Sequence, residues 1–170
     1  KSATDILQAT LSVKSEKNVG STFTCKIPVE VNLGAQDKKD QPPNNATWKK
    51  NITNILVIDD NPLCQKIAME ALIEENFTVH IASDGQEALA LTNQQAFDLI
   101  LVDIGLPDID GFTLSNSIQH QSTHNQGTIL IALTAHNPKS LHEELAGSSL
   151  HDLLTKPLSI TDLANTLLKI

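Results

Sequence analysis

The sequence predicts an α/β protein, in which a doubly wound parallel sheet of (βα)5 type follows a smaller β-hairpin. Two observations predict this class. From residue 54 onward, apolar runs of strand length alternate five times with segments that carry helix-starting signals. The runs are apolar at successive positions, which is typical of strands buried on both faces of a parallel sheet. We therefore expect five parallel strands in the order 2-1-3-4-5, with right-handed crossovers covering both faces.

Each element is predicted from a local signal. The strands are expected at residues 54–58, 78–82, 99–102, 128–133 and 150–155. The helices are expected at residues 62–75 and 84–94, and from about Phe112, Pro138 and Ser159 onward. Pro62 occupies a favoured first helical position, and Asp84 with Glu87 forms a pattern like a capping box. Asn137 is expected to cap the helix that starts at Pro138.

Residues 11–31 predict a β-hairpin. Leu11 and Val13 alternate with polar neighbours, and residues 16–20 are typical of a turn. After the turn, apolar residues occupy every second position, namely Phe23, Cys25, Ile27, Val29 and Val31. Because an isolated two-stranded hairpin is marginally stable in water, we expect this face to pack on a larger surface. Residues 1–33 are therefore interpreted as the end of a larger domain.

Residues 34–53 are predicted to be an exposed linker between the hairpin and a main domain at residues 54–170. They are rich in Gln, Asn, Asp, Lys and Pro, with Pro42 and Pro43 at the centre. Trp48 is the exception in this polar segment. We expect Trp48 to anchor the linker to a neighbouring surface, and stacking on a ligand is the alternative.

Charge divides the chain unevenly. Residues 1–50 carry eight lysines and five acidic residues, whereas residues 51–170 carry four lysines and fifteen acidic residues, giving net charges of +3 and −11. The sequence contains no arginine, so bidentate guanidinium contacts to phosphate or guanine are absent. Because an acidic domain repels a nucleic acid backbone, direct binding to nucleic acid is not expected.

Cysteine use and hydrophobicity predict a cytoplasmic domain. Cys25 and Cys64 show no CxxC or Cys/His spacing, so neither a disulfide framework nor a zinc site is expected. No apolar run approaches the ~18 residues that a membrane helix needs, and the N-terminus lacks the pattern of a signal peptide. No membrane segment is therefore expected in this chain.

The stretch around Asp103 has the pattern of a ligand site. The predicted central strand, residues 99–102, runs into Asp103, and Gly105, Pro107 and Gly111 then turn the chain away. Open α/β sheets place their ligands at the carboxyl ends of their strands. Taken alone, Asp103 also fits a residue that merely caps a strand.

Two further carboxylates are expected beside Asp103. The first strand ends in Asp59 and Asp60, and strands 1 and 3 are neighbours in the predicted order. At a separation of ~4 Å and an effective dielectric constant of ~20, each pair of like charges costs about 4 kcal/mol. A hard divalent cation offsets this repulsion, and oxygen ligands favour Mg²⁺ or Mn²⁺ over zinc. Solvated turn carboxylates are the alternative.

The fourth and fifth strands add groups that bind phosphoryl oxygens. Thr134 and Ala135 close the fourth strand with a hydroxyl and a backbone N–H, and Lys156 closes the fifth with an ammonium. Individually, Thr134 fits a satisfied strand hydroxyl and Lys156 a plain salt bridge. Jointly they predict a phosphoryl site, with Asp103 as the nucleophile and Lys156 and Thr134 holding the oxygens of the transferred group.

The N-terminal segment resembles the end of a known domain. Residues 11–28 read Leu-Ser-Val-Lys-Ser-Glu-Lys-Asn-Val-Gly-Ser-Thr-Phe-Thr-Cys-Lys-Ile-Pro and are similar to the last strands of the ATP-binding domain of sensor histidine kinases. In that family a glycine followed by Ser-Thr-Phe opens the final strand, as Gly20 does here. The family's upstream nucleotide-binding boxes are missing from this sequence, so the resemblance implies that residues 1–33 bind no ATP by themselves.

Residues 54–170 resemble the receiver domain of two-component response regulators, which has a flavodoxin-like fold. The resemblance rests on the residues at the four strand ends, Asp59-Asp60, Asp103, Thr134-Ala135 and Lys156-Pro157. It implies that Asp103 accepts phosphate from a phosphohistidine, with Mg²⁺ bound directly by Asp60 and largely through water by Asp59. The Gly105 carbonyl is implied to complete the protein ligands.

The resemblance also assigns roles to the later strands. Thr134 is implied to be the switch hydroxyl, and Lys156 to contact the phosphate and precede a cis Pro157. Many receivers carry Tyr or Phe three residues before the lysine, where this chain has Leu153. The aromatic half of the family's switch is therefore in question.

The resemblance extends to the parent protein and its partners. A receiver behind a kinase-like ending implies a hybrid sensor histidine kinase, most like the respiration-control type, held in the inner membrane of a bacterium. The expected partner is a histidine kinase or a histidine-phosphotransfer domain, docking on the loops around Asp103 and the first helix. Leu63 and Ile67 would offer that partner an apolar patch or belong to the core, and homodimerisation is left open. No further domain is expected after Ile170.

Competing interpretations fit the residues less well. A phosphatase-like aspartyl hydrolase needs Asp-x-Asp at the end of the first strand, where this chain has adjacent aspartates. A calcium loop at residues 108–111 lacks its flanking ligands, and a dinucleotide-binding domain lacks its glycine-rich turn. A receiver used only for docking remains a distinct alternative. Enzyme status is open, since a receiver catalyses its own phosphorylation and dephosphorylation while this chain lacks a kinase site.

Overall fold

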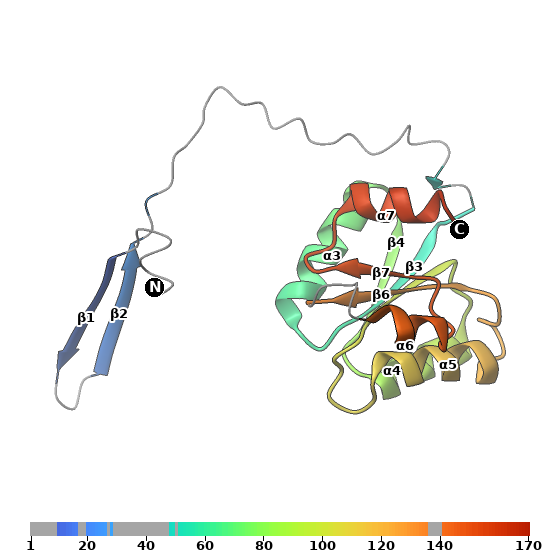
Figure 1. Ribbon diagram of the computed structural model, residues 1–170, viewed down its shortest axis with the longest axis horizontal. Helices are drawn as coiled ribbons and strands as arrows, with labels where there is room; N and C mark the ends of the chain where they lie inside the picture. The colour runs from blue at the N-terminus through green and yellow to red at the C-terminus, as the bar shows by residue number, and fades with distance from the viewer. Residues whose placement is uncertain (1–9, 17–19, 27, 29–47, 50, 136–140) are drawn as a thin grey trace, which may run out of the picture. The chain divides into compact units, whose positions relative to one another are not determined.

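We describe the protein from a computed structural model, shown in Figure 1. The structure describes residues 10–16, 20–26, 28, 48–49, 51–135 and 141–170, without the side chains of residues 142 and 143. The chain divides into two compact units, residues 1–39 and residues 40–170. The predicted linker, residues 34–53, spans this division.

The first unit contains an antiparallel hairpin of strands β1 (Thr10–Glu16) and β2 (Gly20–Lys26). Leu11 lies opposite Cys25 and Val13 opposite Phe23, so these four side chains share one face. Leu11, Val13 and Phe23 are exposed within this unit. The hairpin is therefore confirmed for the described residues, while positions 27 and 29–31 of the predicted apolar face lie outside them.

The second unit contains a parallel sheet, and its strand order confirms the prediction. The strands are β3 (Asn54–Ile58), β4 (Thr78–Ala82), β5 (Leu99–Asp103), β6 (Ile129–Thr134) and β7 (Asp152–Thr155). Their order is β4-β3-β5-β6-β7, which is 2-1-3-4-5 along the chain. The first two strands have the predicted bounds.

The last two strands differ from their predicted bounds. Strand β6 is shifted by one residue from the predicted 128–133, and β7 begins two residues later than the predicted 150–155. At the start of β7, the Leu130 N–H donates to the His151 ring (Nδ1, 3.1 Å) and not to a backbone carbonyl. The His151 N–H donates to the Leu130 carbonyl (2.7 Å), but the regular pairing of β6 with β7 begins only at Ile131 and Asp152, which an apolar pattern does not reveal.

Helices cover both faces of the sheet. They are α3 (Pro62–Glu74), α4 (Gly85–Gln94), α5 (Gly111–Gln121), α6 (His142–Ala146) and α7 (Ile160–Leu167). Figure 1 shows α3 and α7 on one side of the sheet, and α4 and α5 on the other. Asp84 caps α4 as predicted, whereas the predicted start at Asn137 and Pro138 lies outside the described residues.

Alternate residues of each strand enter separate cores on the two faces. Val57 and Leu101 pack with the buried residues of α3 and α7, whereas Ile58 and Val102 pack with those of α4 and α5. All four side chains are fully buried. This confirms the prediction that the central strands are covered on both faces and explains their unbroken apolar sequence.

Trp48 is part of the core under α3 and α7, as its predicted anchoring role requires. Only 3% of its surface is exposed, and its ring meets Phe77 edge-on with centroids 5.6 Å apart. Lys49 extends over both rings, donates to the Glu75 carbonyl (2.9 Å) and pairs with the Glu75 carboxylate. The end of the linker is thus fixed to the carboxyl end of α3.

Candidate functional site

The three predicted carboxylates converge at one edge of the sheet. Asp59 and Asp60 follow β3 and Asp103 ends β5, and one oxygen from each lies within 4.8 Å of the others. The sequence places them there because β3 and β5 are parallel neighbours whose carboxyl ends coincide. Asp59 and Asp103 are buried, whereas Asp60 is exposed.

Lys156 joins the two buried carboxylates. Its Nζ lies 2.6 Å from Asp59 Oδ2 and 2.7 Å from Asp103 Oδ2, just beyond the end of β7. Burial lowers the pKa of Lys156, but the hydrogen bonds and negative charges of Asp103 and Asp59 outweigh burial and raise that pKa above its usual value. The ammonium therefore stays charged and offsets part of the carboxylate repulsion.

A cleft of about 520 Å³ opens over Asp103. Its lining brings together the predicted residues from three strand ends: Asp103, Gly105, Thr134, Ala135 and Lys156, joined by Ile104 and Leu141. The Thr134 side chain is buried, whereas Ala135 is exposed. The residues that carry the predicted hydroxyl, backbone N–H and ammonium groups thus line one cleft together with Asp103.

Backbone hydrogen bonds orient the carboxylates. Asp103 Oδ1 accepts from the Gly105 N–H (3.1 Å), and Asp59 Oδ1 accepts from the Asn61 N–H (2.9 Å). The Lys156 N–H donates to the Thr134 carbonyl (2.8 Å), and the peptide bond between Lys156 and Pro157 is cis, as the resemblance implied. The two buried carboxylates are therefore each held by the backbone N–H two residues further on.

Two supporting residues were not singled out for this role from the sequence. Gln65 donates to the Asp59 carbonyl (2.6 Å) and to Ser83 Oγ (3.2 Å). Gly111, expected only to turn the chain, lies so close to β5 that a Cβ there would be 2.6 Å from the Asp103 carbonyl oxygen. Any larger residue at 111 would displace the backbone that carries Asp103.

The donor set fits a divalent ion. Three carboxylates supply hard oxygen ligands, and the exposure of Asp60 leaves one side of the cluster open to water. This combination suits a small, partly hydrated cation such as Mg²⁺ better than a metal that prefers sulfur or nitrogen ligands. A carboxylate nucleophile and an ammonium within one cleft, next to a cation site, can support transfer of an anionic group.

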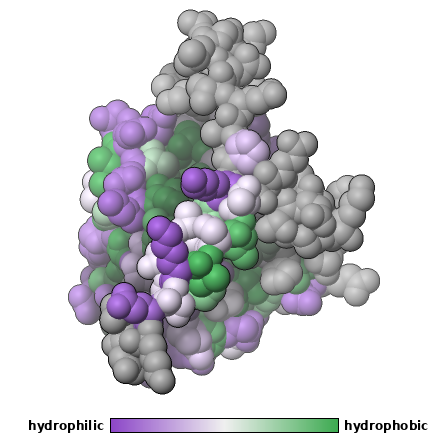
Figure 2. Space-filling model, turned by 90° about the vertical axis from the view of Figure 1, so that its left-hand side faces the viewer, coloured by the Kyte–Doolittle hydropathy of each residue, from purple (hydrophilic) through white to green (hydrophobic). Residues whose placement is uncertain are grey.

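The surface next to the site is partly hydrophobic. Leu63 and Ile67 in the first turns of α3 are 65% and 39% exposed, so neither belongs to the core. Ile67 also lines a small pocket with Asp59 and Lys156. Leu153, at the position where many receivers carry an aromatic residue, is buried in the core under α4 and α5. Figure 2 shows hydrophobic surface (green) interspersed with hydrophilic surface (purple) on the face that it displays.

Residues 55–168 match the family model described as the response regulator receiver domain. Two similar curated proteins are signalling proteins of Escherichia coli. The histidine-protein kinase BarA (strain K12) is 39% identical over 116 residues, covering 68% of this chain and 12% of BarA. The aerobic respiration control sensor ArcB (strain K12) is 32% identical over 150 residues, covering 88% of this chain and 19% of ArcB. The chain thus spans less than a fifth of either relative.

Solved structures support the same fold. The chemotaxis protein CheY4 of Vibrio cholerae is 26% identical, with a TM-score of 0.63, and the match covers 70% of this chain and 98% of CheY4. The receiver domain of the sensor histidine kinase PA1611 from Pseudomonas aeruginosa PAO1 is 28% identical, with a TM-score of 0.61, covering 69% of this chain and 96% of that domain. That structure is described with a magnesium ion coordinated in the active site cleft.

Proposed function

The chain belongs to the response regulator receiver domain family, and from this premise we propose that Asp103 accepts a phosphoryl group from a phosphohistidine in a phosphorelay. The observation that carries the assignment is the position of the Asp103 carboxylate. It ends the central strand, lines the cleft, and has a lysine ammonium 2.7 Å away. Asp59 is more deeply buried and Asp60 does not line the cleft, which favours Asp103 over both.

The proposed reaction is a single displacement at phosphorus. A carboxylate oxygen of Asp103 attacks the phosphorus atom, and the new P–O bond replaces the P–N bond, whose electrons remain on the released imidazole. Lys156 and Thr134 hold the phosphoryl oxygens, together with the Ala135 N–H. The acyl phosphate then passes to another histidine or is hydrolysed by water.

Mg²⁺ is the proposed cofactor, with Mn²⁺ as an alternative of the same ligand preference. Asp59, Asp60, Asp103 and the Gly105 carbonyl would hold it, and when bound it supplies neutralisation of the phosphoryl charge. The acidic cluster supports this proposal, as does the magnesium-bound neighbour. The residues of this chain would position the ion.

The test is Mg²⁺-dependent phosphorylation of the chain by acetyl phosphate, followed by mapping of the modified residue. Asp103→Asn should abolish incorporation, because the amide is not nucleophilic. Undiminished incorporation that maps to Asp59 or Asp60 would contradict the assignment. A receiver used only for docking would incorporate no phosphate and bind no beryllofluoride under these conditions.

We propose the same partners and parent as the resemblance implies. The partner is a histidine kinase or a histidine-phosphotransfer domain, and direct nucleic acid binding is not expected, given the charge of −11 over residues 51–170. The parent is a membrane-anchored hybrid kinase with this domain in the cytoplasm, and residues 1–33 are the end of its ATP-binding domain. Among the described helices, none combines the length and apolar character needed to cross a membrane.

A further inference from the structure

Asp108 links two segments that are separate in sequence. It lies in the loop of residues 104–110, between β5 and α5, and its two carboxylate oxygens accept from different backbone donors at the start of α4. Oδ1 accepts from the Gly85 N–H (3.0 Å) and Oδ2 from the Gln86 N–H (3.2 Å). The first N–H groups of a helix have no partner within the helix, so this carboxylate satisfies two of them. The Gly85 N–H bond in particular lowers the pKa of Asp108.

The loop and the start of α4 are also in close contact. A Cβ on Gly85 would lie 2.2 Å from Ile109 Cγ2, so a side chain at position 85 would force the loop away. Ile109 itself packs against the core under α4 and α5. The absence of a side chain at Gly85 therefore allows the approach that the Asp108 hydrogen bonds require.

The same loop carries a site residue at its other end. Gly105 lines the cleft and donates its N–H to Asp103 Oδ1 (3.1 Å). The loop is closed at its base by the Gly111 N–H, which donates to the Ile104 carbonyl (3.0 Å), and Pro107 restricts the backbone between Gly105 and Asp108. The loop is thus fixed at its base by Gly111 and at its tip by Asp108.

We propose that Asp108 is a positioning residue, which clamps the loop to α4 and thereby fixes the Gly105 backbone and the Asp103 carboxylate for metal binding and phosphoryl transfer. This inference rests on the proposed function. Asp108 itself touches neither the metal site nor the phosphoryl group. Its effect reaches Gly105 through the backbone of Leu106 and Pro107.

The chain offers a matched control in Asp84. Its carboxylate also accepts from a backbone N–H at the start of α4 (Glu87, 2.8 Å), but this bond stays within the helix that Asp84 caps, and the Asp84 side chain makes no hydrogen bond to the loop, all of which the structure describes. Asp84→Ala therefore weakens the same helix end without releasing the loop. Asp108→Asn is an intermediate variant, because its amide keeps one oxygen acceptor and loses the other.

The experiment measures the Mg²⁺ dissociation constant of the unphosphorylated chain by calorimetry, together with the thermal midpoint and the amide exchange rate of Gly105. Partners that orient metal ligands contribute about 10–100-fold to metal affinity, so for this more indirect contact we expect about 3–10-fold weaker Mg²⁺ binding in Asp108→Ala. Faster Gly105 exchange should accompany it. Asp108→Asn should fall between wild type and Asp108→Ala, and Asp84→Ala should lower the midpoint while leaving the Mg²⁺ constant unchanged.

Two results would overturn the inference: an unchanged Mg²⁺ constant in Asp108→Ala, or equal weakening in Asp84→Ala, which would indicate general loss of helix stability. Asp60→Ala, at a proposed ligand, should weaken Mg²⁺ binding more than any Asp108 variant. If the wild-type chain binds no Mg²⁺ and incorporates no phosphate, the proposed function fails first, and the positioning role fails with it.

Discussion

At the scale of single residues, Lys156 balances charge that the sheet brings together. Asp59 is 1% exposed, and its carboxylate and that of Asp103 both pair with the Lys156 ammonium. Removing one member of a buried ion pair leaves a charge without its partner, which costs far more than the pair contributes by itself. Lys156 is therefore expected to matter for stability as well as for phosphate binding.

Lys156→Met should lower the free energy of unfolding by on the order of 3 kcal/mol in the absence of divalent ions. Urea unfolding in EDTA measures this loss, and added Mg²⁺ should restore part of it by neutralising the same carboxylates. Lys66→Met is the matched control, because Lys66 pairs with Glu70 at 3.8 Å on an exposed surface. The control should change stability by less than about 1 kcal/mol. Equal losses in the two variants would contradict the central role of Lys156.

Not every residue that orders the domain was predictable. The convergence of Asp59, Asp60 and Asp103 follows from parallel strands and their order, so the sequence revealed it. Asn125 lies in a polar stretch of the sequence, and nothing in that stretch indicated a structural role for it. It is fully buried, accepts from the Phe97 N–H (2.8 Å) and donates to the Thr92 carbonyl (2.6 Å), about thirty positions away. Such bonds depend on the path of loops, which local patterns do not specify.

At the scale of elements, α3 connects the site to the surface. It begins directly after the carboxylates of β3, with Asn61 as its cap, and its first turns expose Leu63 and Ile67. Its last turn exposes Ile73. At 1.5 Å per residue, Ile73 lies about 15 Å further along the helix than Leu63. Ile73 is therefore a hydrophobic surface residue of the same helix that is remote from the site.

We expect Leu63→Asp and Ile67→Asp to slow phosphotransfer from a phosphohistidine partner by about tenfold or more, since a buried apolar contact of about 1.5 kcal/mol or more is replaced by a charge. In Leu63→Asp, phosphorylation by acetyl phosphate should be unaffected, because this small donor needs no docking surface. Ile73→Asp should leave both reactions unchanged. Rapid-quench measurement of transfer from a phosphorylated histidine-phosphotransfer domain distinguishes the variants, and equal slowing by Ile73→Asp would remove the basis for a docking face.

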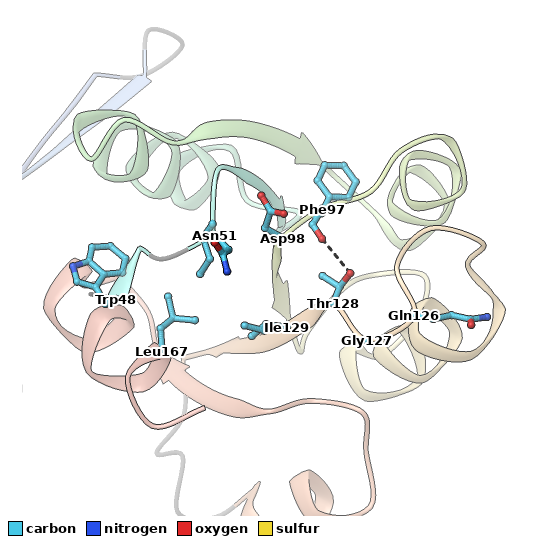
Figure 3. Close-up of a pocket in the computed structure, with 10 residues that line it drawn as sticks. Trp48, Asn51, Phe97, Asp98, Gln126, Gly127, Thr128, Ile129 and Leu167 are labelled. Carbon is cyan, nitrogen blue, oxygen red and sulfur yellow. Dashed lines mark hydrogen bonds between the residues drawn. The ribbon is translucent and has the colours of Figure 1, made fainter. Parts of the chain in front are cut away.

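At the scale of the whole molecule, the receiver extends beyond the residues that define its family. The family match begins at residue 55, yet the compact unit begins at residue 40 and includes Trp48. Figure 3 shows Trp48 and Leu167 on one side of a pocket of about 520 Å³, with Phe97 and Thr128 on the other side. Phe97 and Thr128 lie just before β5 and β6, Leu167 ends α7, and Trp48 precedes β3, so all four are away from the carboxylates at the opposite edge.

This arrangement separates the stability of the domain from its chemistry. A chain of residues 54–170 keeps the whole sheet but loses the contacts of Trp48 with Phe77 and of Lys49 with Glu75. Because loss of a buried Trp side chain typically costs about 3–5 kcal/mol, residues 54–170 should be less stable than residues 40–170 by on the order of 3 kcal/mol. Urea unfolding followed by circular dichroism measures the difference.

Phosphorylation provides the complementary measurement for these two chains. Under conditions where both are folded, acetyl phosphate should modify Asp103 in each at the same rate, because the anchor lies at the amino edge of the sheet and the cleft at the carboxyl edge. Trp48→Ala in residues 40–170 should reproduce the loss of stability, which would assign it to this side chain and not to chain length. If the shorter chain is as stable as the longer one, burial of Trp48 does not stabilise the domain. If the shorter chain is phosphorylated more slowly, the two edges of the sheet are coupled.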